Sequence, residues 1–413
     1  MNIKKYFSRN YEKLREIYEI FRNTEYGKKL NLPDWKFKDY YDFKHLPLLD
    51  PRKVDFRQVF IPADDLWCFI TSGVSGYKKT IYRDIGTIVG YPKEMDEVLR
   101  TDNVVFLHSK RREGESYYET HDVNHKRMYP RGIFAEYENR DELLKYAQKG
   151  DVLFIIEYPL MAEWICHQLE SALESKEILS ENIVKRKVYL ELSGEPVTEK
   201  QVKSIVRRLE KIFQTEVEYF VTYGSNEIGH IGTYIPALHG SQVVYEVISS
   251  LFVEIINDEI VITPYKKYGT ILFRYKTGDK GILSFKDDKT FLKVPGKSQE
   301  EGIIYVAGAQ VSIPNLVSKI EKIAIDCPVG IECVKEDDVE KGKCKLNINV
   351  YVPQTLTESK KEEITHTVKQ FIMDFAILSV ENHLGMVTVD VQCSAEPIKK
   401  RWFIVDKAKE VIK

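Results

Sequence analysis

The chain has 413 residues, which is enough for two domains or for one large domain with an appendage. Its 61 lysine and arginine residues nearly cancel its 63 aspartate and glutamate residues, so charge gives no reason to expect a nucleic-acid or membrane partner. Apolar residues make up 43% of the sequence, a share that is typical of a globular protein and excludes a disordered one. No apolar run reaches the roughly 20 residues of a membrane helix. The N-terminus also lacks the apolar core of a signal peptide, so we expect a cytoplasmic protein.

The first two thirds of the chain alternate between helical and strand-like patterns. Apolar residues at helical spacing predict a helix from Tyr11 to Lys29. Further along, the patterns predict strands at Val104–His108, Val152–Ile156, Lys187–Leu192 and Val217–Thr222, and helices at Glu163–Leu173 and Gln201–Phe213. Strands that alternate with helices favour an α/β layer fold with a largely parallel sheet.

After Tyr245 the pattern changes to β-structure. Residues 246–256 and 259–265 read as strands joined by Asn257-Asp258, a hairpin signal. Residues 269–275 and 281–285 continue this character, which predicts a smaller β subdomain.

From Gly296 onward the order is strand, helix, strand, strand, helix, strand. The expected elements include helices at 314–324 and 359–375 and strands at 345–352 and 386–392. This order is typical of the split βαβ, ferredoxin-like fold. The prediction is therefore a large N-terminal α/β domain with a β subdomain at 1–295, and a small C-terminal ferredoxin-like α+β domain at 296–413.

One loop stands out chemically. Residues 71–79 follow an apolar run and read Thr-Ser-Gly-Val-Ser-Gly-Tyr-Lys-Lys. Glycines let backbone N–H groups approach an anion, and hydroxyls and lysines add donors for phosphate oxygens. The pattern predicts a phosphate-holding loop after a strand, and the alternative is an ordinary turn rich in small residues.

The six cysteines do not favour a metal site or a disulfide framework. No Cys-x-x-Cys pair occurs, and paired spacing is what zinc sites usually show. A group of Cys327, Cys333 and Cys344 meeting in space is the alternative that spacing leaves open.

Three further motifs follow the loop in order. The first is Tyr223-Gly224-Ser225-Asn226-Glu227, and the second is Arg274-Tyr275-Lys276-Thr277-Gly278-Asp279. The third is a glycine-rich segment from Gly296 to Gly308. A basic cluster, Lys399-Lys400-Arg401, follows near the end of the chain. Together they resemble the adenylate-forming superfamily of acyl-CoA synthetases, most closely its phenylacetate-CoA ligase and coenzyme F390 synthetase branch. The resemblance runs from about Leu46 to Asp406.

The resemblance implies a role for each motif in binding ATP and Mg²⁺. It places the β- and γ-phosphates against Thr71, Ser72, Gly73, Ser75, Gly76 and Lys79. It implies that Gly194, Glu195 and Pro196 form a turn that lines the adenine pocket. It also implies that Tyr223 packs on the adenine ring and that Gly224, Ser225 and Asn226 lie along the same edge of the nucleotide. Glu227 becomes the magnesium ligand, a role that suits a carboxylate beside phosphates.

The same resemblance assigns the later residues. Asp279 accepts hydrogen bonds from the ribose hydroxyls, and Lys297 stands where the family usually has an arginine that contacts ribose or phosphate. Lys400 is the expected adenylation lysine, with Lys399 as the alternative, because Asp406 lines up with an aspartate six residues after that lysine. Residues 306–311 resemble the glycine loop of the acyl and pantetheine channel, and His230 is expected to line the acyl pocket.

The implied activity is that of an AMP-forming ligase joining a carboxylic acid, expected to be aryl, to CoA. Its cofactors would be ATP, Mg²⁺ and CoA, and a homodimer is a further expectation because this branch often forms one. One alternative keeps adenylation but transfers to an amine, a protein thiol or a cofactor hydroxyl. Another is a degenerate nucleotide-binding protein, since Val74, Lys297 and the lack of paired aspartates after it depart from the family pattern.

Overall fold

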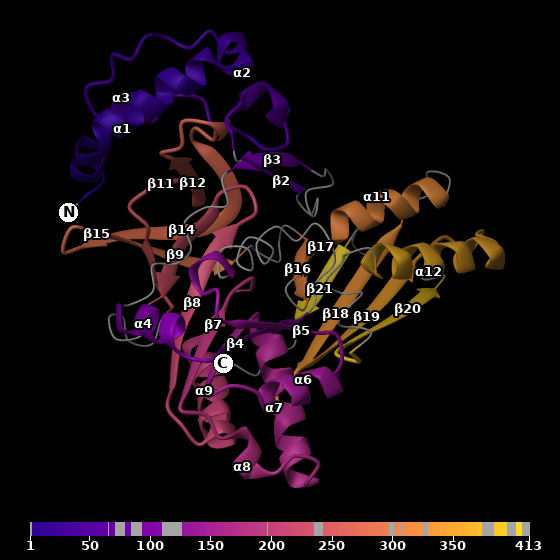
Figure 1. The fold of residues 1–413 in the computed structure, drawn as a ribbon. Helices are drawn as coiled ribbons and strands as arrows, with labels where there is room; N and C mark the ends of the chain where they lie inside the picture. The colour runs from indigo at the N-terminus through magenta and orange to yellow at the C-terminus, as the bar shows by residue number, and fades with distance from the viewer. Residues whose placement is uncertain are drawn as a thin grey trace.

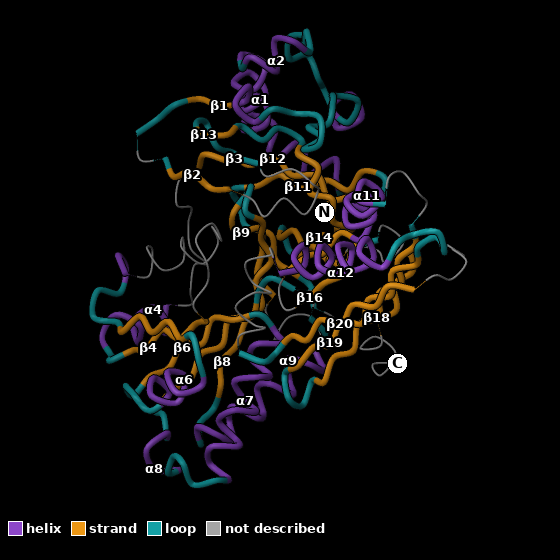
Figure 2. The backbone as a smooth tube through the Cα atoms, turned by 90° about the vertical axis from the view of Figure 1, so that its right-hand side faces the viewer, coloured by secondary structure: helices purple, strands orange, loops and turns teal. Residues whose placement is uncertain are grey.

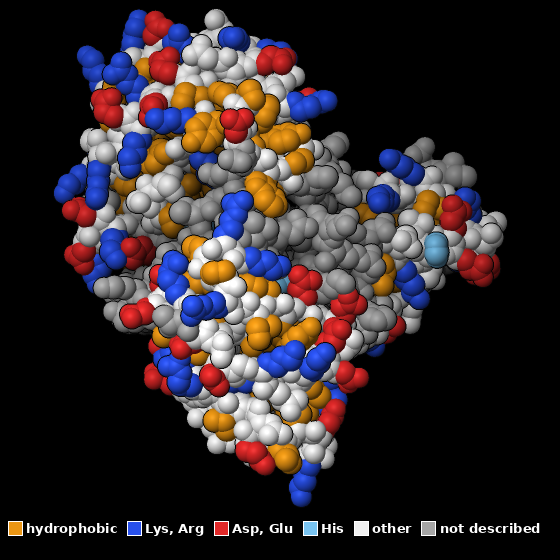
Figure 3. Space-filling view, in the orientation of Figure 1, with side chains coloured by type: hydrophobic (Ala, Val, Ile, Leu, Met, Phe, Trp, Pro, Cys, Tyr) orange, Lys and Arg blue, Asp and Glu red, His pale blue; other side chains and the backbone are white. Residues whose placement is uncertain are grey.

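The computed structural model has an elongated body built on one large sheet, with a smaller sheet beside it (Figure 1). It describes residues 2–64, 66–70, 79–83, 93–109, 126–195, 197–234, 243–296, 302–306, 309–324, 329–373, 384–394 and 402–406. Among these residues, no helix has the length and apolar character needed to cross a membrane. Acidic and basic side chains are interspersed on the face seen in Figure 3.

The large sheet has eleven strands in the order β11-β12-β14-β15-β10-β9-β8-β7-β6-β4-β5. Its parallel part consists of β4 (Val104–Ser109), β5 (Ile133–Tyr137), β6 (Val152–Glu157), β7 (Lys187–Leu192) and β8 (Val217–Ser225). The strands predicted at 104, 152, 187 and 217 are all present.

Both faces of this parallel part are covered by helices. Along β4, Val105 and Leu107 join the core on one face, while Val104 and Phe106 join the core on the other. The first face packs against α6 (Arg140–Ala147), α7 (Pro159–Glu174) and α9 (Glu199–Phe213), and the second against α4 (Lys93–Thr101). Burial on both faces explains why these strands read as continuous apolar runs.

The antiparallel part continues the same sheet. It adds β9 (Gly229–Tyr234), β10 (Tyr245–Val247), β11 (Leu251–Ile256), β12 (Glu259–Pro264), β14 (Tyr275–Lys286) and β15 (Lys289–Gly296). Asn257 and Asp258 both have positive φ, as the predicted hairpin turn between β11 and β12 requires. The expected β subdomain is therefore an extension of the main sheet.

An N-terminal helical layer covers this antiparallel part. It consists of α1 (Ile3–Asn23), α2 (Glu25–Lys29) and α3 (Tyr40–Phe43), at the top of Figure 1. Leu14, Ile17 and Phe21 of α1 are buried in one core with Phe252 and Phe273. Short elements follow this layer: η1 (Phe56–Val59), β1 (Phe60–Ile61), β2 (Trp67–Ile70), β3 (Thr80–Arg83) and β13 (Gly269–Thr270). The short helix α8 (Ser180–Ile183) instead packs against α9 at the other end of the molecule (Figure 1).

The C-terminal region forms a separate four-stranded sheet, hereafter the C-terminal sheet, in the order β20-β19-β18-β21. Its strands are β18 (Gly330–Asp338), β19 (Lys343–Tyr351), β20 (Val387–Ser394) and β21 (Trp402–Asp406). The helices α11 (Ile313–Ile323) and α12 (Glu358–Met373) pack together beside it (Figure 2). The strand expected before α11 is instead a separate hairpin of β16 (Ile303–Val306) and β17 (Ala309–Ser312).

Several expected element boundaries are wrong. The first helix begins at Ile3, where Asn2 accepts the Lys5 N–H, and it ends at Asn23; the next residue, Thr24, caps α2. The strand expected at 246–256 is divided between β10 and β11. The strand expected at 269–275 is interrupted: β13 ends at Thr270 and β14 begins at Tyr275, directly after Arg274, which has a φ of +50°.

Arg274 forms a fully buried ion pair that connects these layers. Its Nε and Nη2 donate to the Glu254 carboxylate at 3.0 and 3.1 Å, and Nη1 donates to the carbonyls of Phe43, Lys44 and Leu46. Burial raises the pKa of Glu254, an effect that the Arg274 guanidinium opposes. The pair joins β11 and the start of β14 to the end of α3.

We expect Arg274→Met to lower the free energy of unfolding by about 3–5 kcal/mol, because it leaves the Glu254 carboxylate buried without its partner. Chemical denaturation measures this loss. The matched control is Arg57→Met, which removes an exposed ion pair to Asp55 and should change stability by less than about 1 kcal/mol. Equal effects of the two substitutions would show that the buried pair has no special structural role.

Candidate functional site

The predicted phosphate loop connects two short antiparallel strands. β2 ends at Ile70 and β3 begins at Thr80, which are register partners, so residues 71–79 close a hairpin. The loop thus follows a strand, as expected. Thr71, Ser72, Gly73, Ser75 and Gly76 lie outside the described residues, whereas Lys79 is described.

Lys79 reaches across to Glu227. Its Nζ lies 3.1 Å from Glu227 Oε1, and both side chains are largely buried, with 12% and 13% of their surface exposed. Glu227 lies in the turn between β8 and β9, with no helix starting there. The far end of the phosphate loop is therefore held beside the predicted magnesium ligand.

Tyr275 faces the same carboxylate from β14. Burial raises the pKa of this phenol well above its ordinary value, and Glu227 adds to the effect both through its charge and through a hydrogen bond. Tyr275 is therefore a protonated donor for Glu227 at neutral pH.

A second tyrosine makes the reciprocal contact. Tyr223, near the end of β8, donates its hydroxyl to Asp279 Oδ2 at 2.7 Å. Its pKa is also raised well above the ordinary value, first by burial and then by Asp279. Each tyrosine thus comes from the segment that carries the other carboxylate: Tyr223 precedes Glu227, and Tyr275 precedes Asp279.

Local backbone geometry brings Asp279 to this position. The first residues of β14 pair with β12 and the later ones with β15, and the register shifts between Lys280 and Ile282. Gly278 has a φ of +81°, and its N–H donates to Glu259 Oε1 at 3.0 Å. A shift of this kind bends a strand, so the start of β14 can turn toward β8 although three strands separate them in the sheet.

The predicted adenine turn lies at the end of β7. Gly194 has a φ of +83°, which favours glycine, and Glu195 follows it before α9. Ser193 is buried and donates to the Thr222 carbonyl at 3.4 Å, on the neighbouring strand β8. This places the turn beside the Tyr223–Glu227 segment at the carboxyl edge of the parallel strands, where ligands bind in open α/β sheets.

His230 lies on β9, close to this segment. Burial lowers its pKa to about 4, so the ring is neutral at physiological pH. Nε2 lies 3.1 Å from the Thr233 hydroxyl, and the buried Nδ1 has no hydrogen-bond partner among the described residues.

Arg83 is a site residue that the sequence did not single out. It is buried at the end of β3, its Nε donates to the Asn226 carbonyl at 3.1 Å, and its guanidinium lies 4.1 Å from the centre of the Phe69 ring. A Cβ on Gly229 would lie 3.3 Å from Nη1. Arg83 therefore fixes the turn that carries Glu227. The sequence signal that could have identified Arg83 is its position at the end of the strand that follows the predicted phosphate loop.

The remaining predicted residues cannot be placed. Pro196, Lys297 and Lys400 lie outside the described residues, as do Ala307 and Gly308 of the glycine loop. The structure brings together Lys79, Tyr223, Glu227 and Asp279, with Gly224, Ser225 and Asn226 between them in the chain.

Chemically, the arrangement offers two carboxylates, one ammonium group and an aromatic ring at a single sheet edge. Glu227 would supply only one protein ligand to a metal ion. Among the described residues, no cluster of three histidine, cysteine or acidic side chains has metal-binding geometry. One carboxylate is, however, enough for Mg²⁺ when phosphates supply further oxygens.

Comparison with known proteins gives a likeness of fold. No family model and no curated protein matches the sequence. The structure is similar to 2-hydroxyisobutyryl-CoA ligase, solved with 2-HIB-AMP and CoA in the thioesterification state, at a TM-score of 0.61 and 12% identity over 98% of this chain and 91% of that one.

Two weaker matches are of the same kind. One is malonyl-CoA ligase, at a TM-score of 0.48 and 12% identity over 80% of this chain and 71% of that one. The other is a double mutant of o-succinylbenzoate-CoA synthetase from Bacillus subtilis, at a TM-score of 0.46 and 14% identity over 79% and 65%. The likeness to 2-hydroxyisobutyryl-CoA ligase shows that the chain has the fold of that enzyme.

Proposed function

We propose that this protein is an AMP-forming ligase that joins a carboxylic acid, of the aryl class, to CoA. The observation that carries the proposal is the convergence of Glu227 and Asp279, each held by a tyrosine from the other's segment. The fold is that of acyl-CoA ligases, and the convergent residues are the ones the sequence motifs assign to nucleotide binding.

The chemistry of such a ligase explains why this set of residues is needed. A carboxylate is a poor acyl donor because oxide is a poor leaving group. Attack of the carboxylate on the α-phosphate of ATP releases pyrophosphate and gives an acyl-adenylate, from which a thiol then displaces AMP. The first step needs a ribose acceptor, phosphate donors and a metal ligand.

Asp279 is the proposed ribose acceptor. Its Oδ2 accepts the Tyr223 hydroxyl, and an ionised carboxylate can accept several hydrogen bonds at once, which suits a group that would also accept from the ribose hydroxyls. The Tyr223 ring would pack against the adenine base, as the sequence motif implies. One hydrogen bond thus aligns the ribose and adenine contacts.

Glu227 is the proposed Mg²⁺ ligand and Lys79 a phosphate donor. In the structure the two side chains form an ion pair at 3.1 Å. With ATP present, Lys79 would transfer to a phosphate oxygen and leave Glu227 to the metal, which supplies charge neutralisation for the phosphates. Tyr275 would keep the carboxylate oriented during this exchange.

The proposal includes a second, mobile domain beginning at residue 296. The 2-hydroxyisobutyryl-CoA ligase structure is described as a thioesterification state, and the likeness to it spans nearly the whole chain. This supports the proposal that the C-terminal sheet lies here in the arrangement used for the CoA step. Lys400 would act in the other half-reaction, where its ammonium group offsets charge on the acyl carboxylate and the α-phosphate.

Asp279→Ala should reduce acid-dependent ATP–pyrophosphate exchange by at least about a hundredfold, because it removes the ribose acceptor and frees Tyr223. The matched control is Asp390→Ala, at an exposed aspartate of β20 paired with Lys345, and it should leave exchange unchanged. Unchanged exchange in Asp279→Ala would refute the ribose assignment.

Tyr223→Phe should weaken ATP binding by about tenfold, or ~1.4 kcal/mol, because the ring remains but Asp279 loses its aligning donor. Calorimetric titration with ATP and Mg²⁺ measures the dissociation constant. Tyr146→Phe, at a tyrosine of α6 that lies outside the site, serves as the control. If both variants bind ATP as the wild type does, the hydroxyl contact has no function in nucleotide binding.

A further inference from the structure

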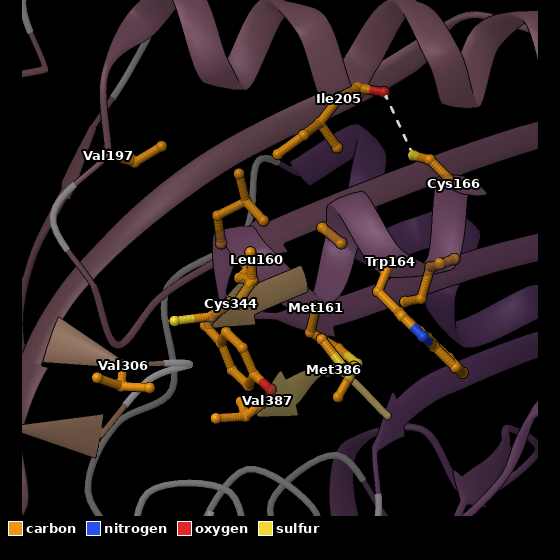
Figure 4. Close-up of a cluster of buried hydrophobic side chains, with 14 of the residues drawn as sticks. Leu160, Met161, Trp164, Cys166, Val197, Ile205, Val306, Cys344, Met386 and Val387 are labelled. Atoms are coloured by element: carbon orange, nitrogen blue, oxygen red, sulfur yellow. Dashed lines mark hydrogen bonds between the residues drawn. The ribbon is translucent and has the colours of Figure 1, made fainter. Parts of the chain in front are cut away.

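The C-terminal sheet packs directly against helix α7, which covers the large sheet. Apolar residues of both parts belong to one continuous core: Leu160, Met161 and Trp164 come from α7, and Cys344, Met386 and Val387 come from the C-terminal sheet. All six are buried, and Figure 4 shows them gathered in one cluster. Separation of the two parts would expose this apolar surface to water, so the docked arrangement is favoured by the hydrophobic effect.

A single glycine lies at the closest approach of the two parts. Gly342, in the turn between β18 and β19, is buried and has a φ of +59°. A Cβ placed on it would lie 2.1 Å from the Trp164 backbone nitrogen and 2.4 Å from the Trp164 Cα. Atoms at these distances overlap, and a backbone in the middle of a helix does not move aside as a flexible side chain can. Only glycine permits the turn to pack this closely on α7.

The α7 backbone is anchored at this point. The Trp164 ring packs nearly parallel to the ring of Tyr137 on β5, with 6.2 Å between centroids and 6° between planes. The Tyr137 hydroxyl in turn donates to Glu157 at 3.0 Å, and that carboxylate is fully buried at the end of β6. Because α7 is tied to two strands of the large sheet, a steric conflict at Gly342 would displace the C-terminal sheet and leave the helix in place.

One hydrogen bond crosses the contact beside this glycine. Arg208 of α9 donates to the carbonyl of Glu340, two residues before Gly342, at 3.0 Å. The same guanidinium donates to both carboxylate oxygens of Glu170 on α7, at 3.0 and 2.7 Å. The charge of Arg208 is therefore paired without the C-terminal sheet, and undocking breaks only the bond to the carbonyl. The contact is thus specific in its geometry but easily reversed.

We propose that Gly342 is a positioning residue for the CoA step: its lack of a side chain lets the β18–β19 turn pack on α7, and Arg208 holds the turn there. This inference rests on the proposed function, in which the docked arrangement of the C-terminal sheet serves thioester formation. A side chain at position 342 would disfavour that arrangement and leave the contacts of Glu227 and Asp279 unchanged. It would therefore slow one half-reaction and spare the other.

Docking is measured without turnover by energy transfer within the full chain. A donor and an acceptor dye are attached through unnatural amino acids at two exposed residues, Glu174 at the end of α7 and Lys369 on α12. Gly342→Ala should lower the ratio of docked to undocked molecules at least about tenfold, because the added methyl group overpacks the contact. The matched control is Gly385→Ala, at a glycine that also has a positive φ, +70°, but where a Cβ meets no atom within 4 Å. It should keep the wild-type ratio.

The two half-reactions provide the second readout. Gly342→Ala should slow the release of AMP by CoA from a supplied acyl-adenylate, in proportion to the lost docked population, while acid-dependent ATP–pyrophosphate exchange continues at the wild-type rate. Equal loss of both half-reactions would overturn the positioning role. The absence of exchange in the wild type would refute the ligase function, whereas normal exchange together with unaffected thioester formation in Gly342→Ala would refute the role of Gly342 alone.

A further pair of variants tests the contact without adding bulk. Arg208→Gln removes the donor to the Glu340 carbonyl and should lower the ratio of docked to undocked molecules about fivefold. Glu170→Gln changes only the α7 partner of Arg208 and should leave the ratio near that of the wild type. A wild-type ratio in both Gly342→Ala and Arg208→Gln would overturn the proposal.

Discussion

A buried guanidinium, that of Arg274, connects the N-terminal helical layer to the strand that carries the candidate site. It contacts the Glu254 carboxylate and three carbonyls at the end of α3, and it is itself fully buried. A charge taken out of water this completely persists only where its hydrogen bonds are satisfied, so its neighbours are held in one geometry. The next residue, Tyr275, faces Glu227, and Asp279 follows four residues later.

The site then depends on contacts between segments distant in the chain. Lys79 meets Glu227, and Tyr223 meets Asp279, across separations of 148 and 56 residues. Arg83 fixes the turn between β8 and β9 from a third segment. Lys79, the turn at Gly194 and the start of β14 lie near the edge where the parallel strands end. A small displacement of any one of these segments would separate the two carboxylates.

The sequence predicts four of the parallel strands, β4, β6, β7 and β8, and the helix α9, because strong local patterns govern them: apolar runs in the strands, and apolar residues at helical spacing after the Thr198 cap. It does not predict β5, which has a less continuous apolar pattern. Prediction from the sequence fails where tertiary contacts determine the ends of a strand or the sheet that it joins. The strand expected at 269–275 breaks after Thr270, ahead of the buried Arg274 with its positive φ, and the hairpin before α11 does not join the C-terminal sheet. For the candidate site, the motifs identified Glu227 and Asp279. The contacts of Tyr223 with Asp279 and of Tyr275 with Glu227 depend on the bend in β14, and the contact of Arg83 depends on the position of β3. No local sequence pattern encodes these tertiary arrangements.

Release of AMP from ATP, measured with mixed aromatic and aliphatic acids in the presence and absence of CoA, tests the central claim most directly. The account predicts sustained AMP release only when both an acid and CoA are present, with aromatic acids giving the higher rate. Adenylate formation that is indifferent to CoA would contradict the assignment of the acceptor and direct the search to an amine, a protein thiol or a cofactor hydroxyl. ATP binding without AMP release for any acid would contradict the ligase assignment itself.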